Sequence, residues 1–435
     1  MPLEETLMRL ASVVLLSSVA AFATMSQGSA ADLPMTKAAP IDYVRVCSIH
    51  GAGFFYIPGG DVCLKVGGYV RAEYLYAQPK WSVPGNGRSA DATGFLARGR
   101  LEVDARSSSE WGTIRAFFRF ELTRTTGAYR ALGVPAGSVN DSSLDKAFIQ
   151  FAGFTAGVAQ SFFDFYANDL NYGGSLGSDN GQTQLLAYSA TFGSGFSATI
   201  ALEDRNQRNV GTSYYSAAGQ RLPDVVGNLL VDQDWGSAQL SGALHQLNSS
   251  TIYGSNIYGS RVDSTYGFAV QGGVKVKLPM LAAGDYLWLQ AAYTDGALSY
   301  IGINGDQAIG PLVGIAADGV IVNGDIKKTK GWNALAAMLH YWTPNIRQSV
   351  FGGYTKVNYS GAVTSTYNGL SDFNTWTVGS NLIWSPVSAM DIGVEVLYTK
   401  LDPNGRTLVY DNGVTAIYKS SEDQWQARLR FQRDF

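Results

Sequence analysis

The chain has 435 residues and a formal net charge of −3, and 46% of its residues are apolar. This balance excludes a strongly basic surface of the kind that binds nucleic acid. After residue 30 there is no run of about 18 apolar residues, which excludes a transmembrane helix. The 50 glycines and the 24 Tyr, 20 Phe and 9 Trp favour aromatic-rich strands joined by tight turns.

The N-terminal region predicts export. Residues 10–23 form the apolar segment LASVVLLSSVAAFA, and small residues follow at 28–31. This order is typical of a secretory signal peptide, which we place at 1–30, so that 31–62 becomes a periplasmic N-terminal segment. The residues before the apolar segment include Glu4 and Glu5, where basic residues are expected. A start at Met8 would give the more usual signal MRLASVV, so two starts, Met1 and Met8, stay open.

Two cysteines, Cys47 and Cys63, precede the first predicted strand. An exported chain with one close pair of cysteines and no competing thiol favours a disulfide. A loop of this length would stabilise the fold by about 3 kcal/mol in the chain-entropy description. The alternatives are two free thiols or a metal site. His50 alone lies between the cysteines as a further ligand, so we expect neither a metal nor a cofactor.

The clearest strand pattern runs from Thr93 to Arg124. Charged and apolar side chains alternate there, with a turn near Ser109, and a period of two indicates β-strands. Each strand has about a dozen residues, long enough for a tilted strand to span a bilayer with its apolar face on lipid and its charged face in a wet lumen. Taken alone, this hairpin leaves open a soluble sandwich or a lipocalin-like barrel.

The rest of the chain repeats this pattern with alternating long and short connections. Short turns on one side and long loops on the other are typical of outer-membrane barrels, and an even strand count puts both ends on the periplasmic side. We therefore predict an all-β fold, a 16-stranded antiparallel transmembrane β-barrel over 63–435 with long external loops and short periplasmic turns. The expected strands are 63–77, 93–108, 111–124, 144–152, 155–162, 184–192, 196–205, 225–234, 237–248, 264–278, 285–298, 331–343, 346–360, 373–385, 389–401 and 422–435.

Aromatic residues fall into two sets along these strands. Amphipathic rings prefer the headgroup level of a membrane, so two separated sets predict two interfacial girdles. Trp111, Trp235, Trp342 and Trp384 sit beside short turns, and Tyr74, Tyr76, Tyr359 and Tyr398 sit beside long loops.

Three stretches resemble one known family. They are the block VRVC...GAGFFYIPGGDVCLKVGGYVRAEY, the sequence ADLP at 31–34, and the terminal RFQRDF. Together they resemble the general porins of alphaproteobacteria, of the Brucella and Rhizobium outer-membrane type. The block with two cysteines is the specific part, and the remainder matches as a rhythm of strands and loops.

The resemblance implies an outer-membrane porin, a water-filled passive diffusion channel for small hydrophilic solutes and ions. It implies a homotrimer surrounded by outer-membrane lipid and lipopolysaccharide, and a terminal aromatic residue, here Phe435, that the barrel-assembly machinery reads. In porins the third long loop folds into the barrel and narrows it, so 163–183 corresponds to the constriction loop. A substrate-selective channel for one anion or sugar class is the alternative within transport.

Charged residues on the first three strands and the last strand would lie together in a closed barrel. Like charges this close need water or counter-charges, and a wet lumen supplies both. We expect a positive wall facing acidic residues of the constriction loop, although each arginine taken singly could be a structural ion pair. The predicted pore residues are Arg71, Arg98, Arg100, Arg106, Arg115, Arg119, Arg428 and Arg430, opposite Asp164, Asp169 and Asp179.

The sequence gives little support for an enzyme. The three histidines, His50, His245 and His340, have no Ser or Asp motif near them in the sequence, and we expect them to be structural. The Gly-rich pieces lack the spacing of a phosphate loop. A receptor or adhesin barrel would need a folded plug domain, and 31–62 is too short for one. We expect no catalytic residues.

Overall fold

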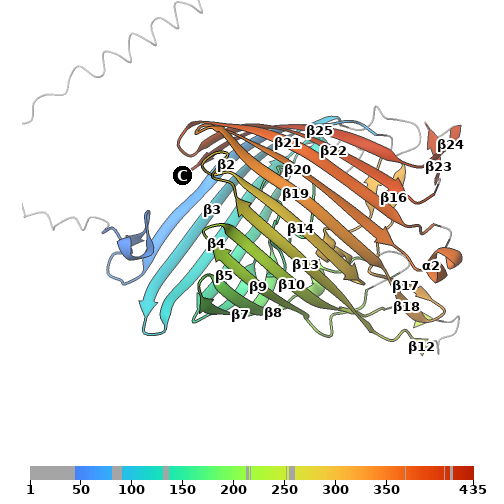
Figure 1. Ribbon diagram of the computed structural model, residues 1–435, viewed down its shortest axis with the longest axis horizontal. Helices are drawn as coiled ribbons and strands as arrows, with labels where there is room; N and C mark the ends of the chain where they lie inside the picture. The colour runs from blue at the N-terminus through green and yellow to red at the C-terminus, as the bar shows by residue number, and fades with distance from the viewer. Residues whose placement is uncertain are drawn as a thin grey trace, which may run out of the picture. The chain divides into compact units, whose positions relative to one another are not determined.

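Sixteen antiparallel strands close into a barrel, as predicted (Figure 1). The computed structural model describes residues 45–80, 91–130, 137–211, 215, 217–250, 252–253, 260–367, 369–405, 407–411 and 415–435. The predicted signal peptide and the start of the mature chain lie outside these residues. The barrel strands are β2 (Cys63–Ala77), β3 (Thr93–Ser109), β4 (Gly112–Thr125), β5 (Val139–Phe151), β6 (Phe154–Ala159), β7 (Thr183–Gly193), β8 (Phe196–Glu203), β9 (Asp224–Gln233), β10 (Gly236–Leu247), β13 (Thr265–Lys277), β14 (Tyr286–Asp295), β19 (Lys330–Thr343), β20 (Ile346–Asn358), β21 (Phe373–Val387), β22 (Met390–Pro403) and β25 (Glu422–Asp434).

The barrel closes between its first and last strands. β2 pairs with β3 on one side and with β25 on the other, so Arg71 lies between Arg98 and Gln432 in the ladder. The chain end joins this seam, because the main chain of Phe435 exchanges two hydrogen bonds with Gly68. A β-carbon at Gly68 would lie 2.0 Å from the Arg100 carbonyl oxygen, so glycine is required at this close approach. Closure leaves no free sheet edge. A bilayer does not tolerate a free edge, because the main-chain groups there would lack hydrogen-bond partners.

The two faces of each strand have the predicted character. On β2 and β3, Val70 and Phe95 point outward and are each 62% exposed, whereas Tyr69 on the inner face is 6% exposed. Outward apolar side chains that stay exposed are expected where lipid is the solvent. The alternation in the sequence therefore assigned the lipid and lumen faces of this hairpin correctly.

The long connections carry small elements of their own. These are η3 (Gly127–Tyr129), η4 (Arg205–Gln207), β11 (Ile252–Tyr253), β12 (Ser260–Arg261), η5 (Leu298–Ile301), β15 (Gln307–Ile309), β16 (Leu312–Gly314), β17 (Gly319–Val322), β18 (Asp325–Lys328), α2 (Gly361–Thr366), β23 (Thr407–Asp411) and β24 (Thr415–Lys419). In the described part of the chain, no helix is long and apolar enough to cross a membrane.

The position predicted for one girdle residue was wrong. Tyr359 follows β20 directly and was expected at the outer interface, but its side chain is 8% exposed and its hydroxyl donates to the Ile315 carbonyl at 2.7 Å. The connection between β14 and β19 folds inward and covers it. Trp111, at a short turn, is 70% exposed, as a ring at the headgroup level should be.

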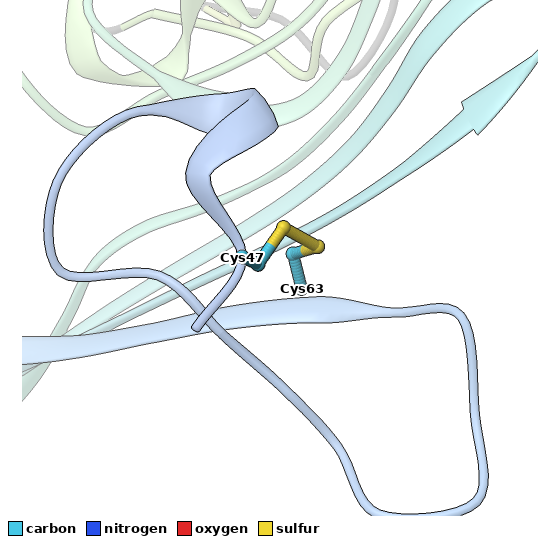
Figure 2. The surroundings of a disulfide bond; sticks show 2 residues. All are labelled: Cys47 and Cys63. Carbon is cyan, nitrogen blue, oxygen red and sulfur yellow. A yellow bond between two sulfur atoms is a disulfide. The ribbon is translucent and has the colours of Figure 1, made fainter. Parts of the chain in front are cut away.

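The predicted disulfide is confirmed. Cys47 and Cys63 are bonded and buried, with 5.9 Å between their α-carbons (Figure 2). The bond ties the residue before η1 (Ser48–His50) to the first residue of β2. Between the cysteines, β1 (Phe55–Tyr56) pairs with the start of β2. The segment therefore extends the sheet at the periplasmic rim.

The assignment of the faces can be tested by placing a charge in lipid. Leu101 points outward from β3 and is 43% exposed. Leu101→Arg should lower the free energy of unfolding by roughly 2–4 kcal/mol if the site lies near the midplane. The measurement is equilibrium unfolding in detergent or lipid vesicles. As a control, Glu102→Gln on the lumen face should change it by about 1 kcal/mol or less. A Leu101→Arg barrel of normal stability would show that the faces are reversed.

Candidate functional site: the lumen and its constriction

The connection between β6 and β7, residues 160–182, lies inside the barrel, and we call it the constriction loop. Its apolar side chains pack against the inner wall. Phe163 and Tyr166 are fully buried, and Leu176 is 2% exposed, against wall residues that include Trp288 and Phe351. A loop with apolar residues at intervals can lie on the wall because that side of the barrel is apolar as well.

Polar side chains of the wall between β9 and β22 bind the main chain of this loop, and we call them the anchoring belt. Six amides and one carboxylate take part, one from each of seven strands, at distances of 2.6–3.2 Å. A buried loop must satisfy its main-chain donors and acceptors, and the belt does so without any regular secondary structure. β20 contributes no belt residue, and there Gly353 leaves room for Leu176. The belt consists of Asn228, Gln239, Gln271, Gln290, Asn333, Asn381 and Glu395.

The base of the loop is held by a buried ion pair. Asp164 accepts from Arg208 at 3.2 Å, and the side chains of both residues are almost completely buried. The same carboxylate also accepts from Ser178 and from the main-chain N–H of Asn180 at 2.6 Å. Its oxygens are fully used inside the fold. Asp164 was expected to face the arginines across the pore, but the structure places it in the anchor of the loop.

Two cavities meet beside the loop. The external one has a volume of about 1000 Å³ and the periplasmic one about 510 Å³. Four residues line both cavities, namely Arg71, Asp169, Tyr172 and Arg430. They mark the place where the two cavities adjoin, and we call them the eyelet.

The predicted arginines line one wall, on β2, β3, β4 and β25. Their carboxylate partners are shared. Glu121 binds Arg98 at 3.0 Å and Arg100 at 2.5 Å, and Asp104 binds Arg106 and Arg115 at 2.7 and 2.9 Å. Sharing means that each carboxylate faces two guanidinium groups. The wall is therefore held together by ion pairs and still keeps a surplus of positive charge.

Six of the eleven predicted pore residues line a cavity. Five others lie elsewhere: Arg98, Arg106 and Arg115 are held by wall carboxylates, Arg428 lies 6.0 Å from the Tyr129 ring, and Asp164 is in the loop base. The six cavity residues are Arg71, Arg100, Arg119, Arg430, Asp169 and Asp179.

Two charged residues of the external cavity were missed. Asp145 and Lys146 line it, and Asp145 binds Arg119 at 3.1 Å. The ladder between β4 and β5 shifts by one residue here, so both side chains reach the lumen from adjacent positions. A bulge interrupts the alternation of inward and outward side chains from which the lumen residues were predicted. The adjacent pair of opposite charges in the middle of a strand was the available signal.

The surroundings of two carboxyl groups in the constriction loop shift their pKa values. Burial raises the pKa of Asp169 and that of Asp179. Hydrogen bonds from Asn168 and Gln160 to Asp179 oppose this rise, since they favour the charged form. Both loop carboxyl groups are therefore less readily ionised than a solvated carboxyl group would be.

Other external loops fill the opposite part of the lumen. Leu298, Leu312 and Val320 are completely buried in a hydrophobic cluster formed mainly by the connection between β14 and β19. Two loop residues, Gln207 and Asn304, reach the external cavity. The open passage therefore follows the arginine wall and does not occupy the whole barrel cross-section.

Two of the histidines have carboxylate partners that are distant in sequence. His245 lies 2.8 Å from Asp224 in a buried site, and His340 lies 2.6 Å from Asp285. Tyr300 donates to Asp224 at 2.7 Å, so this group links the external loops to β9 and β10. The described residues contain no group of three or more His, Cys, Asp or Glu able to hold a metal.

Comparison with known proteins gives consistent matches. The profile described as "Porin subfamily" matches residues 32–427. Porin Omp2b of Brucella melitensis is 32% identical over 315 residues, 65% of this chain and 84% of the relative. Porin Omp2b of Brucella neotomae is 30% identical over 433 residues, 97% of this chain and 99% of the relative. The solved outer membrane channel DcaP of Acinetobacter baumannii is similar in fold, with a TM-score of 0.65 and 15% identity over 87% of this chain and 99% of that one.

The anchoring belt can be tested by removing two of its donors. Asn333 and Asn381 donate to the carbonyls of Leu176 and Leu170 at 2.7 and 2.6 Å. Replacing both by Leu removes hydrogen bonds that contribute about 1 kcal/mol each and leaves buried carbonyls unpaired. We expect a loop that fluctuates, seen as a larger and noisier ionic current through single barrels in planar bilayers.

The matched control for this test is Gln348→Leu. The Gln348 amide binds Trp342 and Ser380 and does not contact the loop. Its current should resemble that of the unmodified protein. A quiet, unchanged current in the Asn333/Asn381 double variant would show that the belt does not hold the loop.

Proposed function

Since this chain belongs to the porin subfamily and is an outer-membrane diffusion channel, we propose that the arginine wall and two loop carboxylates, Asp169 and Asp179, form its constriction and select the ions that pass. The observation that carries this proposal is the meeting of two cavities at the eyelet. Small hydrophilic solutes and ions pass there by passive diffusion. The family and the relatives point to a channel rather than to an enzyme.

Charge across the eyelet orients solutes. Arg71 and Arg430 lie on one side, with Asp169 on the constriction loop. Opposite charges across a narrow wet passage produce a transverse field, and such fields act strongly where water is scarce. Dipolar solutes align in this field, whereas apolar solutes would have to displace ordered water. The surplus of arginine on the wall favours anions over cations.

Assembly and export complete the proposal. Cleavage of the segment 1–30 would release a mature chain whose residues 31–62 lie on the periplasmic side, ahead of the barrel at 63–435. The terminal Phe435, which is 68% exposed, is available to the barrel-assembly machinery. Outer-membrane lipid and lipopolysaccharide surround the outer face. A substrate-selective channel remains the second candidate, and the next subsection describes the ligand that it would take.

The primary test is ion conduction and its selectivity. Purified protein in planar bilayers should conduct, and an absence of ion conductance would contradict a diffusion pore. Arg98→Gln with Arg100→Gln should shift the reversal potential across a salt gradient toward cations and raise conductance. Both arginines bind Glu121, so their removal also frees that carboxylate. The shift should shrink from 0.01 M to 1 M salt, as the screening length falls from about 30 Å to about 3 Å.

The control for the selectivity test is Arg106→Gln. Arg106 is held by Asp104 at 2.7 Å and lines neither cavity. Its removal should move the reversal potential much less than the double replacement does. Equal shifts in the two variants, or none in the double variant, would place the selective residues elsewhere.

We also expect a homotrimer. Apolar side chains on the outer face of β2, including Val66 and Val70, are exposed and free to pack against a neighbouring copy. Outer-face packing between barrels buries surface that lipid would otherwise cover. In mild detergent the unheated protein should migrate on a gel at about three times the mass of the heated chain. A monomeric mass in light scattering under the same conditions would contradict this assembly.

A further inference from the structure

One cation of the eyelet lacks a carboxylate of its own. Arg71 approaches Glu73 only to 3.9 Å, and that carboxylate is bound more closely by Arg430 and by the Tyr129 hydroxyl, each at 2.6 Å. The Nε of Arg71 donates to Gln432 at 2.8 Å. Within the described part of the chain, no closer ion pair to Arg71 is found. Its terminal nitrogens are therefore available to a solute in either cavity.

Positive charge crowds around this residue. Arg98 lies directly opposite Arg71 in the ladder between β2 and β3, an arrangement that is unfavourable for like charges. Arg71 and Arg100 also stack on the Tyr69 ring, with guanidinium carbons 4.5 and 4.6 Å from its centre. The stack fixes the direction of both side chains. An anion bound by Arg71 would relieve the repulsion that the wall carboxylates leave.

Below Arg71, the periplasmic cavity has an aromatic side. Tyr172, Tyr286 and Tyr341 line it, from the constriction loop, β14 and β19. Arg430 stacks on Tyr172 at 3.6 Å, which holds that ring in place. Aromatic side chains in the same cavity as a guanidinium suit a solute that carries both a flat ring and a negative group. The cavity volume of about 510 Å³ admits a single ring of benzoate size.

Two of the three acidic residues that line this cavity have side-chain partners. Asp391 binds Arg347 at 2.6 Å, and Asp434 accepts from the Gln432 amide at 2.8 Å. The third, Asp169, lies on the constriction loop and supplies the negative side of the eyelet. Arg347 also lines the cavity and continues the row of cations toward the periplasm. These three carboxylates are matched in number by Arg71, Arg347 and Arg430, so an anion that reaches Arg71 meets no surplus of negative charge in the cavity lining.

We propose that the eyelet binds small aromatic carboxylates, with the carboxylate on Arg71 and the ring beside Tyr172, Tyr286 and Tyr341. This proposal rests on the diffusion function and names a solute class that the channel retains on its way through. Binding is noncovalent and reversible. The guanidinium provides a bidentate donor pair for the carboxylate, and the tyrosines provide apolar contact for the ring.

The test is block of single-channel current in potassium chloride by benzoate. Acetate supplies the charge without the ring, and benzamide supplies the ring without the charge. Benzoate should block at lower concentration than either, and the half-blocking concentration should rise by roughly tenfold in Arg71→Gln, because a charge-assisted hydrogen-bond pair is lost. Tyr286→Leu with Tyr341→Leu should bring the benzoate value toward that of acetate.

The matched control is Arg106→Gln, which should leave block by benzoate unchanged because Arg106 is held by Asp104 and lines neither cavity. A steady potassium chloride current before addition shows that the pore itself works, so failure of block is distinct from failure of the channel. Equal block by acetate or benzamide, or benzoate block that survives Arg71→Gln, would overturn the proposal.

Discussion

Hydrogen bonds from the inner wall to the main chain of the constriction loop are the interaction on which the rest of this lumen depends. A loop without regular structure carries donors and acceptors that must be paired wherever water is excluded. Wall amides such as Asn333 and Asn381 supply these partners, and the Arg208–Asp164 pair closes the loop base. The loop is thereby pinned to one side of the barrel, and both cavities follow from its position.

The opposite wall carries many guanidinium groups, which repel one another unless carboxylates lie between them. Shared carboxylates hold the arginines in pairs, as Glu121 does for Arg98 and Arg100. Sharing leaves fewer negative than positive charges, and a wet lumen screens the surplus at a modest cost. The wall is therefore both ordered and positive. Order comes from the pairs, and we propose that ion preference comes from the surplus.

The passage is asymmetric because the external loops pack as a hydrophobic cluster inside the barrel. Leu298 and Leu312 are completely buried there, and Tyr359 is buried in the same cluster. Burial of apolar side chains between loops and wall stabilises an inward fold that a solvated loop would not adopt. The external cavity lies between the strands β2–β5 and β25 and the constriction loop.

The sequence by itself determined the barrel, because a period of two with alternating long and short connections depends only on local geometry and on the two solvents of a membrane wall. It determined the faces of the arginine strands for the same reason, and it determined the Cys47–Cys63 bond because the chain predicts export and has one close pair of cysteines. It did not determine which loop carboxylate faces the pore. Asp164 is bound by Arg208 from a distant segment, and a bulge brings both Asp145 and Lys146 into the lumen. Such contacts join residues far apart in the chain, so only the tertiary structure decided them.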